Sequence, residues 1–391
     1  MVGNNRKLAG NIALFPFAAL LIAVGSSAQA DWAVEPFVNT SLVFDDNIRF
    51  STTDAQSSTG LAANAGVVIS NETDAVKTRV EPRVSYRSYA EDSDLNSFDQ
   101  YLSLSTTSFG ERSDLGLDLS FANDSTRTSE LEDSGITFIN KRRTYFSMAP
   151  SWRYLLTQLT SVKVRYRFEG SQYEDSGENG LNDFENQNAT VDFERRLSEE
   201  SDFVVRGYYQ RYKVLELTNK ASSLGLELGY KKRFSPRLEG GFFVGGVNTE
   251  STTEGKDDTS SGGSGSVSLI YKGETARYSG KYRLGVVPSS TGVVYLQNRI
   301  SASVDSRINE KLSWKLSALA QNRETLSDNA TQSDRLYYSV SPSISWRMKK
   351  DWRLQARYTF AAEDRNDDSG TANRNQVYVG VEYRKARLTV Y

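Results

Sequence analysis

The chain has 391 residues, with 47 Lys and Arg against 49 Asp and Glu, and it contains no histidine and no cysteine. The lack of histidine excludes Ser-His-Asp esterases and histidine-base proteases, and it removes the commonest transition-metal ligand. The lack of cysteine excludes disulfides, thiol nucleophiles and thiolate metal sites. The balanced charge gives no reason to expect a nucleic-acid partner.

The first thirty residues have the pattern of a secretory signal peptide. Arg6 and Lys7 form a charged start, residues 12–24 an apolar core, and Ala28-Gln29-Ala30 a small-residue cleavage site. We therefore expect a cleaved leader over residues 1–30 and a single mature domain over residues 31–391, exported to the outer membrane of a Gram-negative bacterium.

Between Trp32 and Tyr391, about eighteen short segments alternate apolar and polar residues one by one. In Ser161–Glu169, for example, valines and aromatics take one face while Lys163, Arg165 and Arg167 take the other. The segments 334–347 and 351–360 follow the same rule. Because strand side chains alternate faces, each segment has one oily and one wet face. This pattern predicts an all-β, transmembrane, antiparallel up-and-down barrel of about eighteen strands, with sixteen also possible, whose outer face contacts outer-membrane lipid.

The connections between the segments alternate in length, as expected for such a barrel. We expect tight links at residues 71–74, 111–114, 155–160, 198–202, 235–237, 272–274, 308–311 and 348–351. Longer links rich in Ser, Asp, Asn and Gly are expected at 45–58, 123–135, 174–183, 249–264 and 363–374. The short turns would share one rim of the barrel and the long loops the other.

All five tryptophans lie beside short turns or at the mature start. They are Trp32, Trp152, Trp314, Trp346 and Trp352. Tryptophan prefers the membrane interface, where its ring is apolar and its N–H is wet. We expect an aromatic girdle at the periplasmic rim, although a chance grouping beside turns would give the same pattern.

Basic residues concentrate on the wet faces of the segments. The pore-lining candidates are Arg79, Arg83, Arg87, Lys163, Arg165, Arg167, Lys281, Arg283, Arg353 and Arg357. One interpretation is structural, because Glu81, Asp118, Glu169, Asp192, Glu194 and Glu227 could pair with them across strands. The other is an electropositive pore that selects anionic or sugar-like cargo. Tyr145, Tyr295 and Tyr337 also fall on wet faces, where they could stack on sugar rings or fill space.

Acidic residues gather in the long links and predict an acidic mouth above the basic lumen. The clusters are Asp45-Asp46, Glu91-Asp92 with Asp94, Glu130 with Glu132-Asp133, Glu174-Asp175, and Glu363-Asp364 with Asp367-Asp368. Paired carboxylates can serve glycosidases or bind Ca²⁺ weakly, but such residues on hydrophilic loops are usually a solvated face. We expect no enzyme, no cofactor and no metal site.

The mature N-terminus carries the element Phe44-Asp45-Asp46-Asn47-Ile48 directly after the first expected strand. This element and the barrel-wide layout resemble the β-barrel porin 2 family, whose members often accompany exopolysaccharide loci. The resemblance implies a barrel of sixteen to eighteen strands that passes polysaccharide, with a periplasmic polysaccharide export protein beneath it. It carries over no catalytic residue, and it implies that the five residues shape the first outer loop.

The C-terminus allows two arrangements. The apolar face of Val377, Val379, Val381 and Tyr383 changes phase near Arg384. Either a bulge extends one long strand to Tyr391, or the last residues form a separate piece.

Three functions follow from these observations, in the order in which we favour them. The first is a pore that takes part in exopolysaccharide export. The second is a general or anion-preferring diffusion porin, in which residues 249–264 could fold into the lumen as a constriction. The third is a surface scaffold or adhesin that transports nothing.

Overall fold

The computed structural model describes residues 32–132, 140–177, 180–326, 334–365, 370–385 and 388–390. The expected leader, including Arg6, Lys7 and Ala30, lies outside the described residues, as do Asp133, Asp367 and Asp368.

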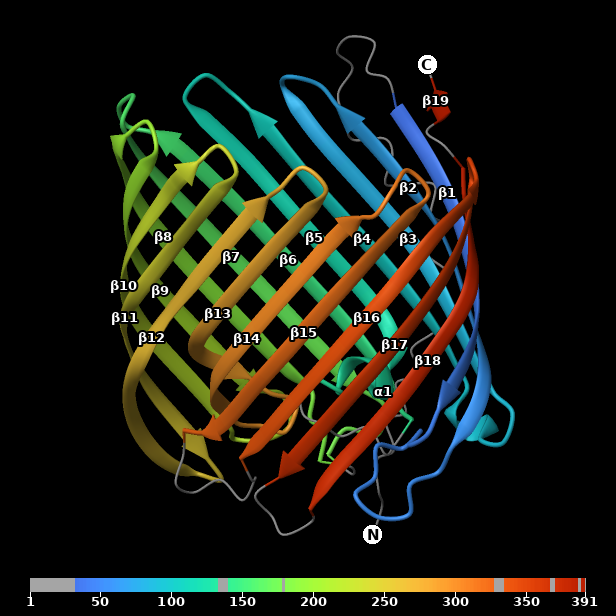
Figure 1. Cartoon of the computed structure of the whole chain (residues 1–391). Coiled ribbons are helices and arrows are strands. Elements are labelled where there is room, and N and C mark those ends of the chain that lie inside the picture. The colour runs from blue at the N-terminus through green and yellow to red at the C-terminus, as the bar shows by residue number, and fades with distance from the viewer. Residues whose placement is uncertain are drawn as a thin grey trace.

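Eighteen long antiparallel strands, each paired with its sequence neighbours, close into a barrel when β1 pairs with β18 (Figure 1). This confirms the expected fold and the higher of the two strand counts. The strands are β1 (Trp32–Asp45), β2 (Ser58–Glu72), β3 (Val76–Tyr89), β4 (Ser97–Phe109), β5 (Ser113–Ser125), β6 (Arg142–Leu155), β7 (Thr160–Tyr173), β8 (Phe184–Ser198) and β9 (Ser201–Val214). They continue as β10 (Lys220–Ser235), β11 (Leu238–Thr253), β12 (Lys256–Lys272), β13 (Ala276–Pro288), β14 (Val294–Arg307), β15 (Leu312–Thr325), β16 (Arg335–Lys349), β17 (Trp352–Arg365) and β18 (Thr371–Arg384).

The remaining elements are short. A single turn of 3₁₀ helix, η2 (Ser93–Leu95), follows β3, and a four-residue helix, α1 (Thr126–Ser129), follows β5. A three-residue strand, β19 (Leu388–Val390), ends the described chain. Within the described ranges, no helix has the length and apolar character needed to span a membrane.

The eight expected tight links all connect strands at one rim of the barrel, and the long connections gather at the other (Figure 1). The expected long loop at 249–264 is wrong. β11 and β12 pair without interruption up to Thr253 and Lys256, joined by Glu254 and Gly255 with φ of 52° and 78°. Positive φ at both turn residues is the geometry of a tight two-residue hairpin, so the Ser- and Gly-rich segment extends the barrel wall instead of forming a loop.

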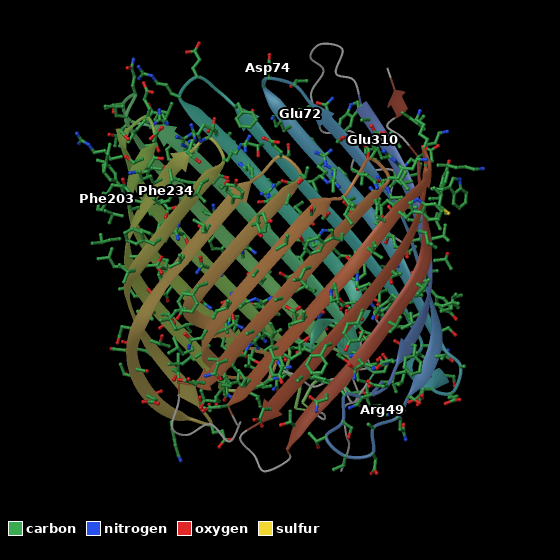
Figure 2. All side chains as sticks on the ribbon, viewed as in Figure 1. Arg49, Glu72, Asp74, Phe203, Phe234 and Glu310 are labelled. Atoms are coloured by element: carbon green, nitrogen blue, oxygen red, sulfur yellow. The ribbon has the colours of Figure 1, made fainter. Side chains whose placement is uncertain are left out.

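Each strand presents an apolar face outward and a polar face inward. Residues paired across neighbouring strands lie on the same face of the sheet. Leu61 therefore faces outward with Leu42, and Gly207 and Gly246 face outward with Leu226. Leu42 remains 69% exposed in the isolated chain, as a side chain that meets lipid would. Figure 2 shows Phe203 and Phe234 on the outer surface near the short-turn rim. The outer surface is therefore an apolar band around a polar interior.

The barrel seam explains the break in the C-terminal pattern. β18 pairs with Phe37–Asp45 of β1, whereas β19 pairs with Trp32–Val34. Between the two partners, the backbone N–H of Lys385 donates to the carbonyl of Pro36. Pro36 has no N–H of its own to give to the ladder, which favours an interruption there. The last residues therefore form a separate piece that continues along β1.

Candidate functional site: a basic lumen narrowed by inward connections

Every basic candidate from the sequence lies at an inward position of its strand. The register places Arg79, Arg83 and Arg87 of β3 on the inner face, because each pairs with an inward residue of β2 or β4. The same argument places the others inward: Lys163, Arg165 and Arg167 on β7, Lys281 and Arg283 on β13, and Arg353 and Arg357 on β17. The wet face of each strand is thus the lumen wall.

Some of these cations have partners nearby. Arg79 pairs with Glu81 at 2.7 Å between Nη2 and Oε2, and Arg167 pairs with Glu169 at 3.4 Å between Nη1 and Oε1. The Arg83 guanidinium lies 4.4 Å from the ring centroid of Tyr101. These contacts are the expected structural pairing, and they account for part of the basic set.

Arg87 donates a hydrogen bond to the Thr128 hydroxyl at 3.2 Å. The other six candidates have no such partner. Among the described residues, no ion pair or side-chain hydrogen bond forms with Lys163, Arg165, Lys281, Arg283, Arg353 or Arg357. Of the proposed acidic partners, Asp192 and Glu227 instead pair with Arg206, at 2.7 and 3.6 Å, and Glu194 pairs with Lys231 at 3.3 Å. Asp118 accepts a hydrogen bond from the Ser105 hydroxyl. Structural pairing therefore leaves these six cations of the lumen wall without an ion-pair partner among the described residues.

Residues 126–132, which follow β5, fold into the lumen. Ser125 caps α1 by accepting a hydrogen bond from the Arg127 backbone N–H, and the chain then reaches the opposite wall. Glu132 pairs with Arg299 of β14 at 2.7 Å, and the Leu131 carbonyl accepts a hydrogen bond from Arg335 of β16 at 2.5 Å. The helix lies inside the barrel toward the long-loop end (Figure 1). This segment, not residues 249–264, is the inward loop.

A second inward element is the tip of the β13–β14 hairpin. β13 stops pairing with β12 after Leu284, which faces Gly265, although both strands continue. The Ser289 carbonyl then accepts a hydrogen bond from the Tyr212 hydroxyl at 2.7 Å. The Ser290 hydroxyl donates to Glu130 at 2.7 Å, which joins the two inward elements to each other. Together they narrow the lumen at its long-loop end.

The first long connection, residues 46–57, also packs inward. Phe50 has φ of 54° and lies edge-on to Tyr337 of β16, with ring centroids 6.4 Å apart. Leu131 packs against the same cluster, whose other members are Ala361, Ala372 and Leu319. An apolar cluster inside a wet barrel excludes water locally, so it anchors the inward connections to the wall.

The family-like element at residues 44–48 lies where β1 and β18 close the barrel, and its side chains contact β18. Phe44 faces outward, while the fully buried Asp45 carboxylate accepts hydrogen bonds from Arg374 and Gln376 of β18. Asp46 accepts two hydrogen bonds from Asn375, and the Asn47 amide donates to the Ser51 and Asn373 carbonyls. Ile48 packs on Tyr89 and Leu95. These side chains join β1 to β18 and set the course of the first loop.

The five tryptophans lie on the outer face close to the short-turn rim. Trp314 faces Ile344 and Trp346 faces Leu312 across β15 and β16, so both share an outward face. The Trp352 ring lies 5.0 Å from that of Tyr383, and the Trp152 ring lies 5.6 Å from that of Tyr154. Trp32 is at the start of β1, at the same rim.

For two of the three tyrosines on the wet faces, the structure favours the space-filling alternative. Tyr295 and Tyr337 are only 6% and 2% exposed, so they pack beneath the inward elements and offer no surface to a sugar ring, whereas Tyr145 donates a hydrogen bond to Glu169.

Most described carboxylates of the expected acidic mouth are neutralised, while Asp133, Asp367 and Asp368 lie outside the described residues. Asp92 and Asp94 both pair with Arg49, whose hydrogen bond lowers the pKa of Asp94. Glu363 is buried against Arg335. Glu174 accepts a hydrogen bond from the Arg142 backbone N–H, and Asp175 pairs with Lys141. Among the described residues of the clusters, Glu91 and the exposed Asp364 form no ion pair. No cluster in the described part of the chain has three acidic residues placed to hold a metal ion.

The sequence analysis did not identify three arginines that hold the inward segments and the junction of β1 with β18. Arg299, Arg335 and Arg374 fix the inward connections and the seam, yet each lies in a segment whose alternation gives no sign of a distant partner. The contact between Glu130 and Ser290 joins residues 160 positions apart. Only their place on a wet strand face, near the long-loop end, could have suggested these arginines.

No protein-family model matches the sequence, and no curated protein matches it. Solved structures of similar shape include OccAB3 of Acinetobacter baumannii, at 12% sequence identity over 90% of this chain and 99% of that chain, with a TM-score of 0.45. Another is OccK2 (OpdF) of Pseudomonas aeruginosa in complex with glucuronate, at 9% identity over 92% and 98% of the two chains, with a TM-score of 0.48. A third is the FrpB iron transporter of Neisseria meningitidis, at 9% identity over 91% and 82%, with a TM-score of 0.45. At these values the likeness concerns the barrel fold and says nothing of cargo.

Proposed function

We propose that this chain is an outer-membrane pore of a Gram-negative bacterium through which small anionic solutes diffuse. The observation that carries the proposal is the set of cations on the lumen wall, where Arg165, Arg283 and Arg357 have no ion-pair partner among the described residues. Fixed cations along a narrow aqueous passage raise the local concentration of anions. The chain would act without catalysis or a cofactor.

The orientation follows from the connections. Residues 1–30 would be removed after Ala30, and residues 31–391 would form one barrel domain in outer-membrane lipid. The short turns and the tryptophan ring would face the periplasm, because barrels of this type keep short turns on that side.

The inward connections favour small solutes over a polymer. A barrel of this size is too wide to be filled by wall side chains alone, so inserted segments determine what passes. The Glu130 to Ser290 contact joins two such segments. A polysaccharide chain would have to displace them, whereas a small ion could pass beside them.

Ion selectivity in planar bilayers tests the proposal. Under a KCl gradient, we expect the reversal potential to show a preference for chloride. The triple variant Arg165→Gln, Arg283→Gln and Arg357→Gln should lose most of that preference. As a matched control, Arg211, Lys213 and Lys220 lie on the outer face, and their change to Gln removes the same charge outside the lumen. A wild-type pore that is closed or cation-selective would overturn the proposal.

Exopolysaccharide export is the second candidate, and the resemblance of residues 44–48 to the β-barrel porin 2 family favours it. That function would add a polysaccharide cargo and a periplasmic polysaccharide export protein as partners. Deleting the chain and measuring surface polysaccharide tests it directly. Unchanged export with normal growth would remove this candidate.

A further inference from the structure

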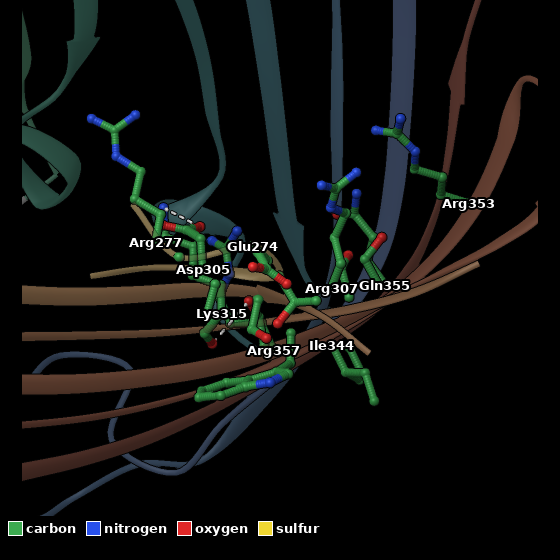
Figure 3. Close-up of a pocket in the computed structure, with 18 of the residues that line it drawn as sticks. Glu274, Arg277, Asp305, Arg307, Lys315, Ile344, Arg353, Gln355 and Arg357 are labelled. Atoms are coloured by element: carbon green, nitrogen blue, oxygen red, sulfur yellow. Dashed lines mark hydrogen bonds and ion pairs between the residues drawn. The ribbon is translucent and has the colours of Figure 1, made fainter. Parts of the chain in front are cut away.

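The lumen wall near the short turns of β13 to β17 contains a recess with a concentrated positive charge. Its volume is about 600 Å³. Arginines from three strands line it: Arg277 of β13, Arg307 of β14, and Arg353 and Arg357 of β17 (Figure 3). Hydroxyl groups of Ser313, Ser343 and Ser345 complete the wall between them. We call this site the arginine recess.

The carboxylates of the arginine recess are already engaged. Asp305 pairs with Lys315 at 3.5 Å, and Glu274 pairs with Arg237 outside the recess at 2.7 Å. Within the described ranges, the four arginine side chains make no ion pair and no hydrogen bond. The recess therefore carries cationic donors that the protein itself leaves unused.

On the opposite wall of the barrel, several basic side chains near the short-turn rim have an ion-pair partner. Lys77 is the second residue of β3 and pairs with Glu72 at 2.6 Å. Arg277 and Arg353 hold the same position in β13 and β17. Others near this rim are paired as well, namely Arg153 with Asp114 at 3.5 Å and Arg196 with Asp202 at 3.7 Å. Lys163, Arg165 and Arg233 are unpaired there, but they do not form a common recess in the described structure.

The strand register adds a second argument. In the ladder, Arg353 lies between Arg347 of β16 and Glu382 of β18, and Glu382 pairs with Arg384 at 2.8 Å instead. Like charges directly opposite each other destabilise a sheet. The Arg347 side chain donates to the Glu310 carbonyl, which leaves the Arg353 guanidinium without a partner. An anion bound beside Arg353 would relieve this repulsion.

We propose that the arginine recess binds the oxyanion group of a small solute, a carboxylate or a phosphate, at the short-turn mouth of the pore. A guanidinium presents planar N–H donors that can bind two oxygens of such a group at once. A halide ion has no such pair of oxygens. The inference rests on the proposed pore function and deepens it, because it names oxyanions as the preferred class of anion.

Calorimetric titration of the detergent-solubilised barrel with inorganic phosphate, at constant ionic strength set with NaCl, tests the inference. We expect saturable binding, weakened tenfold or more by Arg353→Gln with Arg357→Gln. The control is Lys77→Gln with Arg153→Gln, which removes the same charge from the opposite wall and should change the affinity less than twofold. Circular dichroism near 215 nm and heat-modifiable gel migration verify that each variant is folded.

The outcomes separate the inference from the pore function. Absence of phosphate binding in an anion-selective pore, or equal weakening in both double variants, would overturn the inference alone. Binding by a barrel that does not conduct would support the recess and overturn the pore. Succinate that displaces phosphate would support a shared oxyanion site. Binding of an acidic peptide without binding of phosphate would overturn the small-solute assignment.

Discussion

Replacing Asp45 with asparagine should destabilise the barrel at the seam between β1 and β18. The Asp45 carboxylate has no exposed surface, and the Arg374 side chain beside it is 9% exposed. Arg374 donates from Nε and Nη2 at 3.0 and 2.8 Å, and Gln376 donates from Nε2 at 2.6 Å. An amide cannot neutralise the guanidinium, so the variant leaves a buried cation without a counter-charge.

The expected loss is about 3–5 kcal/mol, the usual cost of removing one partner from a buried ion pair. The control is Asp94→Asn, which breaks a pair with Arg49 whose aspartate side chain is 65% exposed. Exposed pairs contribute about 0–1 kcal/mol, so this variant should remain close to the wild type.

Urea unfolding in lipid vesicles, followed by tryptophan fluorescence, measures both free energies of unfolding. The double variant Asp45→Asn with Arg374→Gln removes the buried charge and should recover part of the loss, because the two substitutions are coupled. If Asp45→Asn costs no more than Asp94→Asn, the seam does not depend on this pair and the reasoning is refuted.

Three further predictions follow. Leu228→Arg places a charge on the outer face in mid-strand and should cost about 2–4 kcal/mol of unfolding free energy in vesicles; an unchanged midpoint would contradict a lipid-facing position. Glu132→Gln breaks the pair with Arg299 and should raise single-channel conductance or its noise, whereas traces identical to wild type would show that this contact does not hold the inward loop. The lowered pKa of Asp94 means that its pairing with Arg49 stabilises the first long loop above the ordinary aspartate pKa of about 3.9 and is lost as the pH falls through the lower folded-state pKa. The protection factors of the amides in that loop, which correct for the intrinsic pH dependence of exchange, should therefore be the same at pH 5 as at neutral pH and fall only in stronger acid; lower protection already at pH 5 would contradict the assignment.

The sequence predicted the wall of the barrel because the wall obeys a local rule. Side chains of a strand alternate faces with period 2, so the inward position of Arg283 or Arg357 follows from its neighbours alone. The tight links were equally local, since a few turn residues between alternating segments suffice to mark them.

The interior of the barrel could not be predicted in the same way. The inward course of residues 126–132 depends on partners such as Arg299 and Ser290, more than 150 positions away in the sequence. Residues 249–264 were misread because Ser, Gly and Thr are typical of loops, while the decisive Glu254-Gly255 turn is only two residues long. Composition described the segment, but pairing with β11 determined its structure.

Thiol accessibility tests the central claim, that the polar faces line water and the apolar faces meet lipid. The chain has no cysteine, so single-cysteine variants report one position each. Ser341 and Val340 are adjacent in β16 and face the lumen and the outside, respectively. In lipid vesicles, a charged thiol reagent should modify Ser341→Cys readily and leave Val340→Cys unmodified. Equal modification of the two, or the reverse order, would contradict the account.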